Sequence, residues 1–296
     1  MQFADLQAFV AVHECGSVSA AADTLHLTQP AVTRRLKSLE GTLGTPLFDR
    51  VGRKLCLNPS GLVFLEHARR LLAASRDARQ AVMDLGNRVS GPLRLVTSHH
   101  IGLHRLSPVL RDFTRQYPEV SLDIHFEDSE AAHDLVREAS RELAVVTLDP
   151  RGREDLSYQP IWADPLEFVI AADHPWALRS RPLTLDALAA EPAILPGLST
   201  YTGRLILALF HQHGLTLPTT MATNYLETIG MLVAAGLGWS VLPRTLLQKD
   251  LARLSLPVSV PARTLGVVTH PARTLSAAAQ AFLHVVRQHG DASPAN

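Results

Sequence analysis

The stretch HLTQPAVTRRLKSLE, residues 26–40, has the pattern of a helix whose two faces need different neighbours. Apolar side chains recur at steps of four, three and four, which is the spacing of one buried helical stripe: Val32, Leu36, Leu39 and Leu43. The opposite side carries polar and basic residues: Gln29, Thr33, Arg34 and Lys37. A chain with this helix must bury the apolar stripe against other helices of its own. The polar face then remains exposed and can bind another molecule.

Two shorter helical patterns precede this helix, and a pair of strands follows it. Gly16 ends the first helix and Ser17 or Ser19 can cap the second, whose Ala20–Ala22 run lets another helix cross closely. Thr28 caps the third helix. In PLFDRVGRKLCLNP, residues 46–59, alternating apolar and polar residues around Gly52 predict a hairpin wing. The first 58 residues therefore predict a winged helix-turn-helix.

The polar face of the third helix suits a DNA major groove. Gln29 can bond an adenine edge, Thr33 can contact a thymine methyl group, and Arg34 can bind phosphate or guanine. The wing would place three basic side chains over the DNA backbone: Arg50, Arg53 and Lys54. Periodicity alone leaves open that this is only the solvated face of a surface helix.

The first sixty residues resemble the N-terminus of the LysR-type transcriptional regulators. The resemblance is carried by MQFADLQAFVAVHECGSVSAAADTLHLTQPAVTRRLKSLEGTLGTPLFDR. It implies a winged helix-turn-helix that binds double-stranded DNA, and it adds Thr28 and Pro30 to the residues that face DNA. Family members often have Ser where this chain has Thr33, which keeps the hydroxyl.

Residues 58–86 form one long helical pattern with a heptad seam of seven positions: Phe64, Ala68, Leu71, Ser75, Ala78, Val82 and Leu85. A helix that long with so thin an apolar stripe usually meets a partner helix, although packing on the chain's own domains is an alternative. In the resembling family this linker helix, residues 59–89, joins two subunits. We therefore expect a homodimer, and a homotetramer as the family usually forms.

The pattern changes after Ser90, Gly91 and Pro92, where strands and helices begin to alternate. This alternation predicts an α/β architecture with largely parallel strands in two sheets. Residues 91–296 resemble the LysR-type effector domain, which is built like a type II periplasmic solute-binding protein. The resemblance implies one lobe at about 91–161 plus 267–296 and a second at about 162–266. The fold class is then α+α/β.

Small polar residues at strand ends and helix starts are candidates for binding a small anionic effector. They are Thr97, Ser98, His99, His100, Thr147, Thr200, Thr202, Thr223, Asn224 and Glu227. Capping is the alternative for each one alone. SHHIGLHRL and TNYLETIGMLVAAGLGWSVLP are most similar to the sulfite-responsive and cysteine-biosynthesis regulators, which implies a sulfur oxyanion.

Other classes of protein fit less well. His100 and His104 have the i, i+4 spacing of metal ligands but no third ligand at a defined spacing, so we expect no metal and no cofactor. Ser98 beside two histidines suggests hydrolase chemistry, but no G-x-S-x-G or nucleotide motif accompanies it, so we expect no enzyme. Neither Cys15 nor Cys56 has zinc or redox spacing. The alternatives kept open are a cytoplasmic α/β solute-binding protein or an enzyme with a fused DNA-binding module. Without a signal peptide or long apolar run, we expect a cytoplasmic protein.

Overall fold

The computed structural model describes residues 1–51, 54–83, 88–178, 182–217 and 219–291. It divides into an N-terminal unit, Met1–Gly86 with Glu138–Ser140, and a C-terminal unit, Asn87–Arg137 with Arg141–Asn296. Among the helices described, none combines the length and the apolar character that crossing a bilayer would take.

Three helices begin the N-terminal unit: α1 (Phe3–Cys15), α2 (Val18–Thr24) and α3 (Gln29–Leu43). Gly16 ends α1 with a φ of 68°, a left-handed conformation that glycine adopts at little cost. The Ser17 hydroxyl accepts a hydrogen bond from the N–H of Ala20, and Thr28 accepts one from Ala31. These are the predicted caps of α2 and α3. Val32, Leu36 and Leu39 of α3 are buried against α1 and α2, as predicted, whereas Leu43 is 37% exposed.

The predicted wing is an antiparallel hairpin of β1 (Phe48–Val51) and β2 (Lys54–Leu57), in which Phe48 pairs with Leu57 and Val51 with Lys54. The long helix α4 (Pro59–Met83) follows. Its first half adds Leu65, Ala68 and Leu72 to the core of the three-helix domain. A single apolar core therefore joins the helix-turn-helix, the wing and the start of α4.

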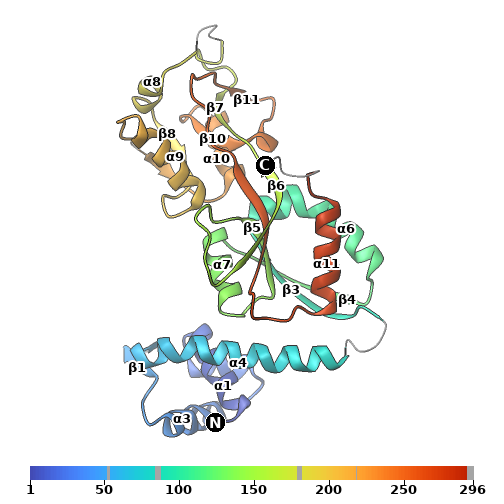
Figure 1. Ribbon diagram of the computed structural model, residues 1–296. Coiled ribbons are helices and arrows are strands. Elements are labelled where there is room, and N and C mark those ends of the chain that lie inside the picture. Colours follow the sequence, from blue (N-terminus) through green and yellow to red (C-terminus); the bar gives the residue numbers. More distant parts are fainter. Residues whose placement is uncertain (52–53, 84–87, 179–181, 218, 292–296) are drawn as a thin grey trace. The chain divides into compact units, whose positions relative to one another are not determined.

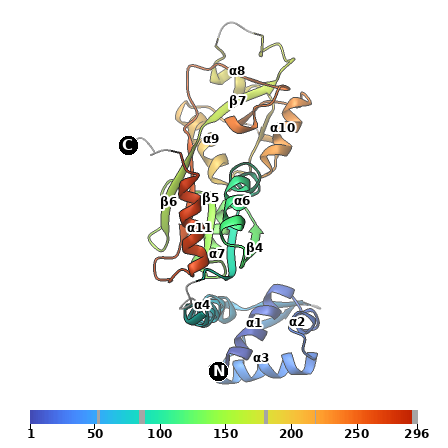
Figure 2. The same ribbon diagram turned by 90° about the vertical axis from the view of Figure 1, so that its right-hand side faces the viewer.

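The first lobe of the C-terminal unit is a five-stranded sheet with the order β4-β3-β5-β12-β6. The strands are β3 (Gly91–Thr97), β4 (Val120–Phe126), β5 (Leu143–Thr147), β6 (Ser157–Asp164) and β12 (Arg263–Thr269). Helices α6 (Ser107–Gln116) and α11 (Ala277–Gln288) cover one face, and α7 (Ser129–Arg137) covers the other (Figures 1 and 2). A short helix α5 (His99–Ile101) and a π-helical segment (Gly102–Leu106) lead from β3 into α6.

The second lobe has a three-stranded antiparallel sheet, β10-β7-β11, and a parallel pair, β8-β9. Its strands are β7 (Leu166–Ala171), β8 (Ala193–Leu195), β9 (Thr219–Ala222), β10 (Ser240–Pro243) and β11 (Leu251–Arg253). Its helices are α8 (Leu185–Ala189), α9 (Tyr201–Gln212), α10 (Leu226–Ala234) and a 3₁₀ turn (Arg244–Leu246). Trp239 is fully buried in this lobe, stacked on Phe210.

The expectation of largely parallel sheets is correct for β4-β3-β5 and for the pair β8-β9, and wrong for the other pairs of strands in the two lobes. The chain leaves the first lobe along β6 and returns along β12, so β12 runs antiparallel to both β5 and β6. In the second lobe, β7 lies antiparallel to β10 and β11. The periodicity of the sequence did not predict β6, α8, β11 or the π-helical segment.

Candidate functional site

The predicted DNA-facing residues of α3 lie together on the exposed side of that helix. Thr28, Gln29, Pro30, Thr33 and Arg34 are all exposed, opposite the buried stripe. The Gln29 side-chain amide donates to the Ser19 hydroxyl of α2 at 2.9 Å. This bond holds the Gln29 side chain across the end of α2, so the helix pair presents a polar edge with a defined shape.

Two of the three predicted wing cations are described. Arg50 in β1 and Lys54 in β2 are exposed, at either side of the hairpin turn. Arg53 lies outside the described residues. The wing therefore offers positive charge near its tip, as an element over a phosphate backbone would need.

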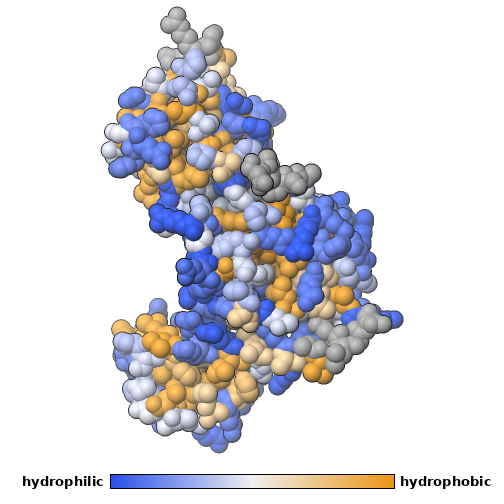
Figure 3. Space-filling view, viewed as in Figure 1, coloured by the Kyte–Doolittle hydropathy of each residue, from blue (hydrophilic) through white to orange (hydrophobic). Residues whose placement is uncertain are grey.

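The predicted heptad seam of α4 divides into two parts. Ala68 is fully buried in the unit's own core and Phe64 packs partly against it, so these two belong to intramolecular packing. Ser75 is half-buried, and Leu85 lies outside the described residues. Among the α4 side chains that the structure describes, the large apolar ones that remain exposed are Leu62, Val63, Leu71 and Val82. In Figure 3, apolar side chains lie along the face of this unit over which α4 runs.

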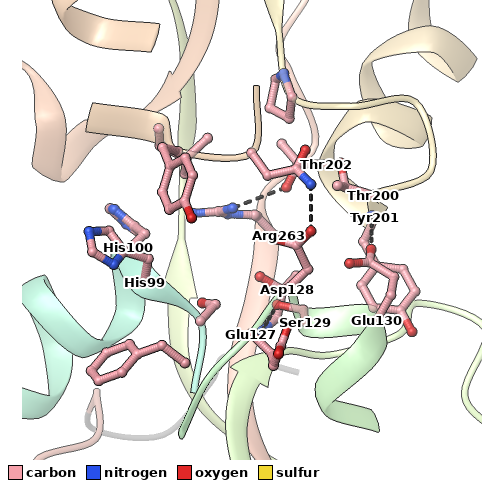
Figure 4. Close-up of a pocket in the computed structure, with 17 residues that line it drawn as sticks. His99, His100, Glu127, Asp128, Ser129, Glu130, Thr200, Tyr201, Thr202 and Arg263 are labelled. Carbon is pink, nitrogen blue, oxygen red and sulfur yellow. Dashed lines mark hydrogen bonds between the residues drawn. The ribbon is translucent and has the colours of Figure 1, made fainter. Parts of the chain in front are cut away.

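A pocket of about 210 Å³ lies between the two lobes of the C-terminal unit. Figure 4 shows its sides: His99 and His100 on α5, residues Glu127–Glu130 from the end of β4 into the first turn of α7, and Thr200–Thr202 at the start of α9. Drug-sized ligands occupy pockets of about 300–1,000 Å³, so this one suits a smaller molecule. Seven of the ten predicted effector residues line it: Ser98, His99, His100, Thr147, Thr200, Thr202 and Asn224.

The other three predicted residues have different roles. Thr97 is fully buried in the sheet, where its hydroxyl donates to the carbonyl of Val145 at 2.7 Å. The Thr223 hydroxyl accepts a hydrogen bond from the N–H of Tyr225. Glu227, in the first turn of α10, contacts two histidines beside the pocket.

Sequence reasoning missed ten lining residues: Phe126, Glu127, Asp128, Ser129, Glu130, Pro196, Tyr201, Tyr225, Leu226 and Arg263. The run from Glu127 to Glu130 follows β4 directly, so the rule of polar residues at strand ends would have found it. Arg263 carried no comparable signal, because it is the first residue of β12 and reaches the pocket only through the pairing of β12 with β6.

Three carboxylates make the pocket more acidic than predicted. Glu130 accepts a hydrogen bond from the backbone N–H of Tyr201 and lies 3.8 Å from the Arg204 guanidinium. Asp128 accepts one from the side-chain amide of Asn224 at 2.5 Å. Burial raises the pKa of Glu130, against the hydrogen bonds it accepts and the charge of Arg204. Carboxylates from the first lobe thus bind donors of the second lobe.

An arginine that lines the pocket, Arg263, is held by a buried ion pair. Two nitrogens of Arg263 donate to one Asp164 oxygen at 2.8 and 2.6 Å, and Arg263 is 8% exposed and Asp164 1%. A third donates to the Thr202 hydroxyl at 3.0 Å. These residues stand at the facing ends of β12 and β6, in register, so the pair ties the crossing strands to α9.

Two histidines and a carboxylate meet at one edge of the pocket. Glu227 Oε1 lies 3.2 Å from His100 Nδ1 and 3.0 Å from His104 Nε2. Burial lowers the pKa of His100, although its hydrogen bond with Glu227 acts in the other direction. Burial would raise the pKa of Glu227, but the hydrogen bond from His100 and other contacts outweigh it and hold the value at about 2. The carboxylate is therefore ionised.

Comparison with known proteins adds two family matches. Residues 3–62 match the family described as bacterial regulatory helix-turn-helix protein, lysR family. Residues 86–291 match the LysR substrate binding domain.

Individual relatives extend over most of the chain. A hydrogen peroxide-inducible genes activator of Pectobacterium carotovorum subsp. carotovorum is 25% identical over 294 residues, covering 98% of this chain and 97% of the relative. The HTH-type transcriptional regulator CbbR of Rhodospirillum rubrum is 32% identical over 252 residues, covering 83% and 81%. A full-length OxyR variant from Pseudomonas aeruginosa has a TM-score of 0.74 at 23% identity, over 97% of this chain and 95% of that one. These relatives give no support to the expected similarity to sulfite-responsive and cysteine-biosynthesis regulators.

Proposed function

The chain belongs to the LysR family of bacterial regulatory helix-turn-helix proteins, and on that premise we propose how its two units divide the work. It is a DNA-binding transcriptional regulator with an effector-binding domain. We propose that Gln29, Thr33 and Arg34 read a major groove while the wing contacts the backbone. The exposed polar face of α3 above a buried stripe is the observation that supports this. Acting on DNA, the protein would work in the cytoplasm.

The proposed effector is a small oxyanion held in the pocket between the lobes. The donors available to it are the Ser98 and Thr202 hydroxyls, because the backbone N–H groups of Tyr201 and Gly203 at the start of α9 already donate to Glu130 and to the Thr200 hydroxyl. Ser98 precedes α5, but its hydroxyl makes no capping bond there, which leaves it free to contact a ligand. Sulfite, sulfate and thiosulfate fit the small volume and remain the class to test first.

A peroxide response through a thiol in the pocket does not fit this chain. Thiolates are the side chains that peroxide oxidises readily. Both cysteines, Cys15 and Cys56, lie in the N-terminal unit, and the sequence contains no other. We therefore do not propose, from the name of the peroxide-inducible relative, that a cysteine in this effector domain senses peroxide.

Hydrolysis is the weaker proposal. A serine nucleophile needs an imidazole within hydrogen-bonding reach of its hydroxyl. In the described part of the chain, His100 contacts Glu227 instead, and no hydrogen bond links Ser98 to a histidine. Ser98 is better suited to donate to a bound ligand.

We expect a matched pair of variants to test the effector proposal. Calorimetry on the full chain would titrate sulfite, sulfate and thiosulfate against panels of amino acids and aromatic acids. Ser98→Ala should abolish saturable oxyanion binding, whereas Thr202→Ser keeps the hydroxyl that Arg263 binds and should retain it. Exclusive binding of an amino or aromatic acid would refute the oxyanion class. Failure of the full chain to select any motif from random duplex DNA would refute the proposed regulatory role.

A further inference from the structure

Three side chains with metal-binding chemistry converge beside the pocket. The ligand atoms of His100, His104 and Glu227 all lie within 4.8 Å of one another. Donor atoms bound to a tetrahedral zinc at about 2.0–2.1 Å are about 3.3 Å apart. The contacts of 3.2 and 3.0 Å from Glu227 Oε1 to the two imidazoles are close to that separation.

The backbone places the two histidines on one side. They are four residues apart, and His104 lies in the π-helical segment that follows α5. Their ring centroids are 4.8 Å apart, with the ring planes 39° from one another. Single π-helical turns are frequent at functional sites, and they shift side chains out of the regular helical register. The third ligand comes from α10, in the other lobe, which is why sequence spacing did not reveal it.

Two buried polar atoms of this cluster lack partners. His100 is 5% exposed, and its Nε2 makes no hydrogen bond among the described residues. Glu227 Oε2 is likewise buried and unpartnered there. Because a carboxylate only accepts, His100 Nδ1 and His104 Nε2 each donate a proton to Glu227 when no cation is bound, and a cation bound at these two nitrogens would take the place of those protons. A buried carboxylate oxygen without a partner, such as Glu227 Oε2, is uncommon unless a ligand completes it.

The Glu227 carboxylate contacts the two histidines, whereas the nearby arginines contact another carboxylate. The two arginines on this side of the pocket are directed to a different carboxylate: Arg263 contacts Asp164 at 2.6 Å, and Arg105 contacts it at 3.6 Å. Neutral imidazoles and an ionised carboxylate are the forms that bind metals.

We infer that His100, His104 and Glu227 form a binding site for a divalent transition-metal cation, with Zn²⁺ as the preferred ion. Two imidazoles and one carboxylate, without a thiolate, are the ligand set of open zinc sites. Three protein ligands leave a fourth position for water or for an oxygen of the effector. Since the ligands come from both lobes, the bound cation would favour the arrangement in which the lobes meet.

The test uses the full chain after treatment with a chelator. Zn²⁺ is titrated in competition with a chromogenic chelator, and Co²⁺ is titrated with its visible spectrum as the readout. We expect one equivalent per chain and a tetrahedral Co²⁺ spectrum. His104→Gln and Glu227→Gln should each weaken Zn²⁺ binding by at least about tenfold, because even indirect support of a ligand is worth 10- to 100-fold.

The matched control is His289→Gln, which removes a histidine that contacts a carboxylate, Asp112, at 2.9 Å but belongs to no three-ligand group in the described part of the chain. This variant should bind Zn²⁺ like the parent. His104 is partly exposed, so its replacement should leave tryptophan fluorescence and far-UV circular dichroism unchanged. Less than half an equivalent of saturable Zn²⁺ would overturn the inference. So would unchanged binding in His104→Gln and Glu227→Gln, or an equal loss in His289→Gln.

Discussion

Glu130, the second residue of α7, accepts a hydrogen bond from the backbone N–H of Tyr201, the first residue of α9. The contact joins the two lobes across the pocket. The N-terminus of a helix attracts negative charge, because its first N–H groups are unpaired and its dipole is positive there. The protein's own carboxylate therefore occupies a position that an oxyanion effector would take.

Replacing Glu130 with Gln should strengthen the binding of a small oxyanion. The change removes a negative charge next to the ligand, and we expect affinity for the sulfate class to rise about tenfold, or about 1.4 kcal/mol. In the parent, the raised pKa of Glu130 means that its protonation begins at a higher pH than for an ordinary carboxyl group. Oxyanion affinity should thus increase as the pH falls towards that range. Isothermal titration calorimetry at several pH values measures both effects.

Glu127→Gln is the control for this prediction, because Glu127 also lines the pocket but contacts His125 rather than α9. An equal gain in both variants would mean that the charge acts at a distance and that the α9 position is not special. Weaker binding in Glu130→Gln would indicate an effector that donates hydrogen bonds to the carboxylate.

The sequence predicted much of this pocket, because strand ends and helix starts are local features. Ser98 and Thr202 could be placed from their positions next to periodic segments. The Asp164–Arg263 pair could not, since its members are 99 residues apart and meet only through the register of β6 with β12. Strand β6 itself has no regular alternation of buried and exposed residues, so its periodicity gave no signal.

Two substitutions on α3 should separate backbone contact from base recognition. Arg34→Ala should reduce the steepness of the slope of log K against log salt concentration by about 0.9, which is the contribution of one phosphate contact. Gln29→Ala should cost about 1–3 kcal/mol on the preferred site and little on unrelated DNA. Fluorescence anisotropy at several salt concentrations distinguishes these effects.

The control is Arg115→Ala, which removes an exposed arginine of α6 in the C-terminal unit. It should leave both the slope and the affinity unchanged. If Gln29→Ala weakened binding to all sequences equally, its bond to Ser19 would have a structural rather than a base-reading role.

Leu71 provides a test of α4 as the dimerisation helix. Its side chain is 42% exposed in the single chain, so Leu71→Asp should not unfold the protein. In a dimer seam the same carboxylate would be buried without a partner, at a cost of several kcal/mol. We expect light scattering to give the mass of a monomer. Gln80→Asp, nine residues further and half a turn around the helix, should keep the parent's mass. The mass of the parent in both variants would place the contact on another surface.

The heptad pattern of α4 predicted a partner helix but did not show which residues of α4 stay exposed to contact that partner. Phe64 and Ala68 satisfy the heptad, yet they pack against the chain's own α1 and α3 core. When one helix packs both against its own domain and against a partner helix, the two sets of apolar residues overlap in the sequence. The periodicity alone then cannot say which of the two surfaces a given residue contacts.

His133 should make the C-terminal unit less stable in mild acid. Its ring is fully buried, Nδ1 donates to the Ser129 carbonyl at 2.5 Å, and Nε2 has no partner among the described residues. Burial lowers the pKa of His133, an effect that outweighs the opposing hydrogen bond to Ser129. As the pH falls below about 6.5, the His133 imidazole binds a proton in the unfolded chain but not in the folded chain. The free energy of unfolding should then fall by up to about 1.4 kcal/mol per pH unit, until the folded-state pKa is reached.

His133→Phe keeps a ring between Tyr158 and Tyr201 but cannot titrate, so the loss of stability between pH 7 and pH 5 should be smaller than in the parent. The three tryptophans, Trp162, Trp176 and Trp239, all lie in the C-terminal unit, so urea unfolding followed by their fluorescence reports on that unit alone. The same replacement at an exposed position, His211→Phe, should leave the pH dependence of the parent intact. A parallel loss in all three proteins would assign the acid sensitivity to other groups and show that the buried imidazole of His133 accepts a proton without unfolding.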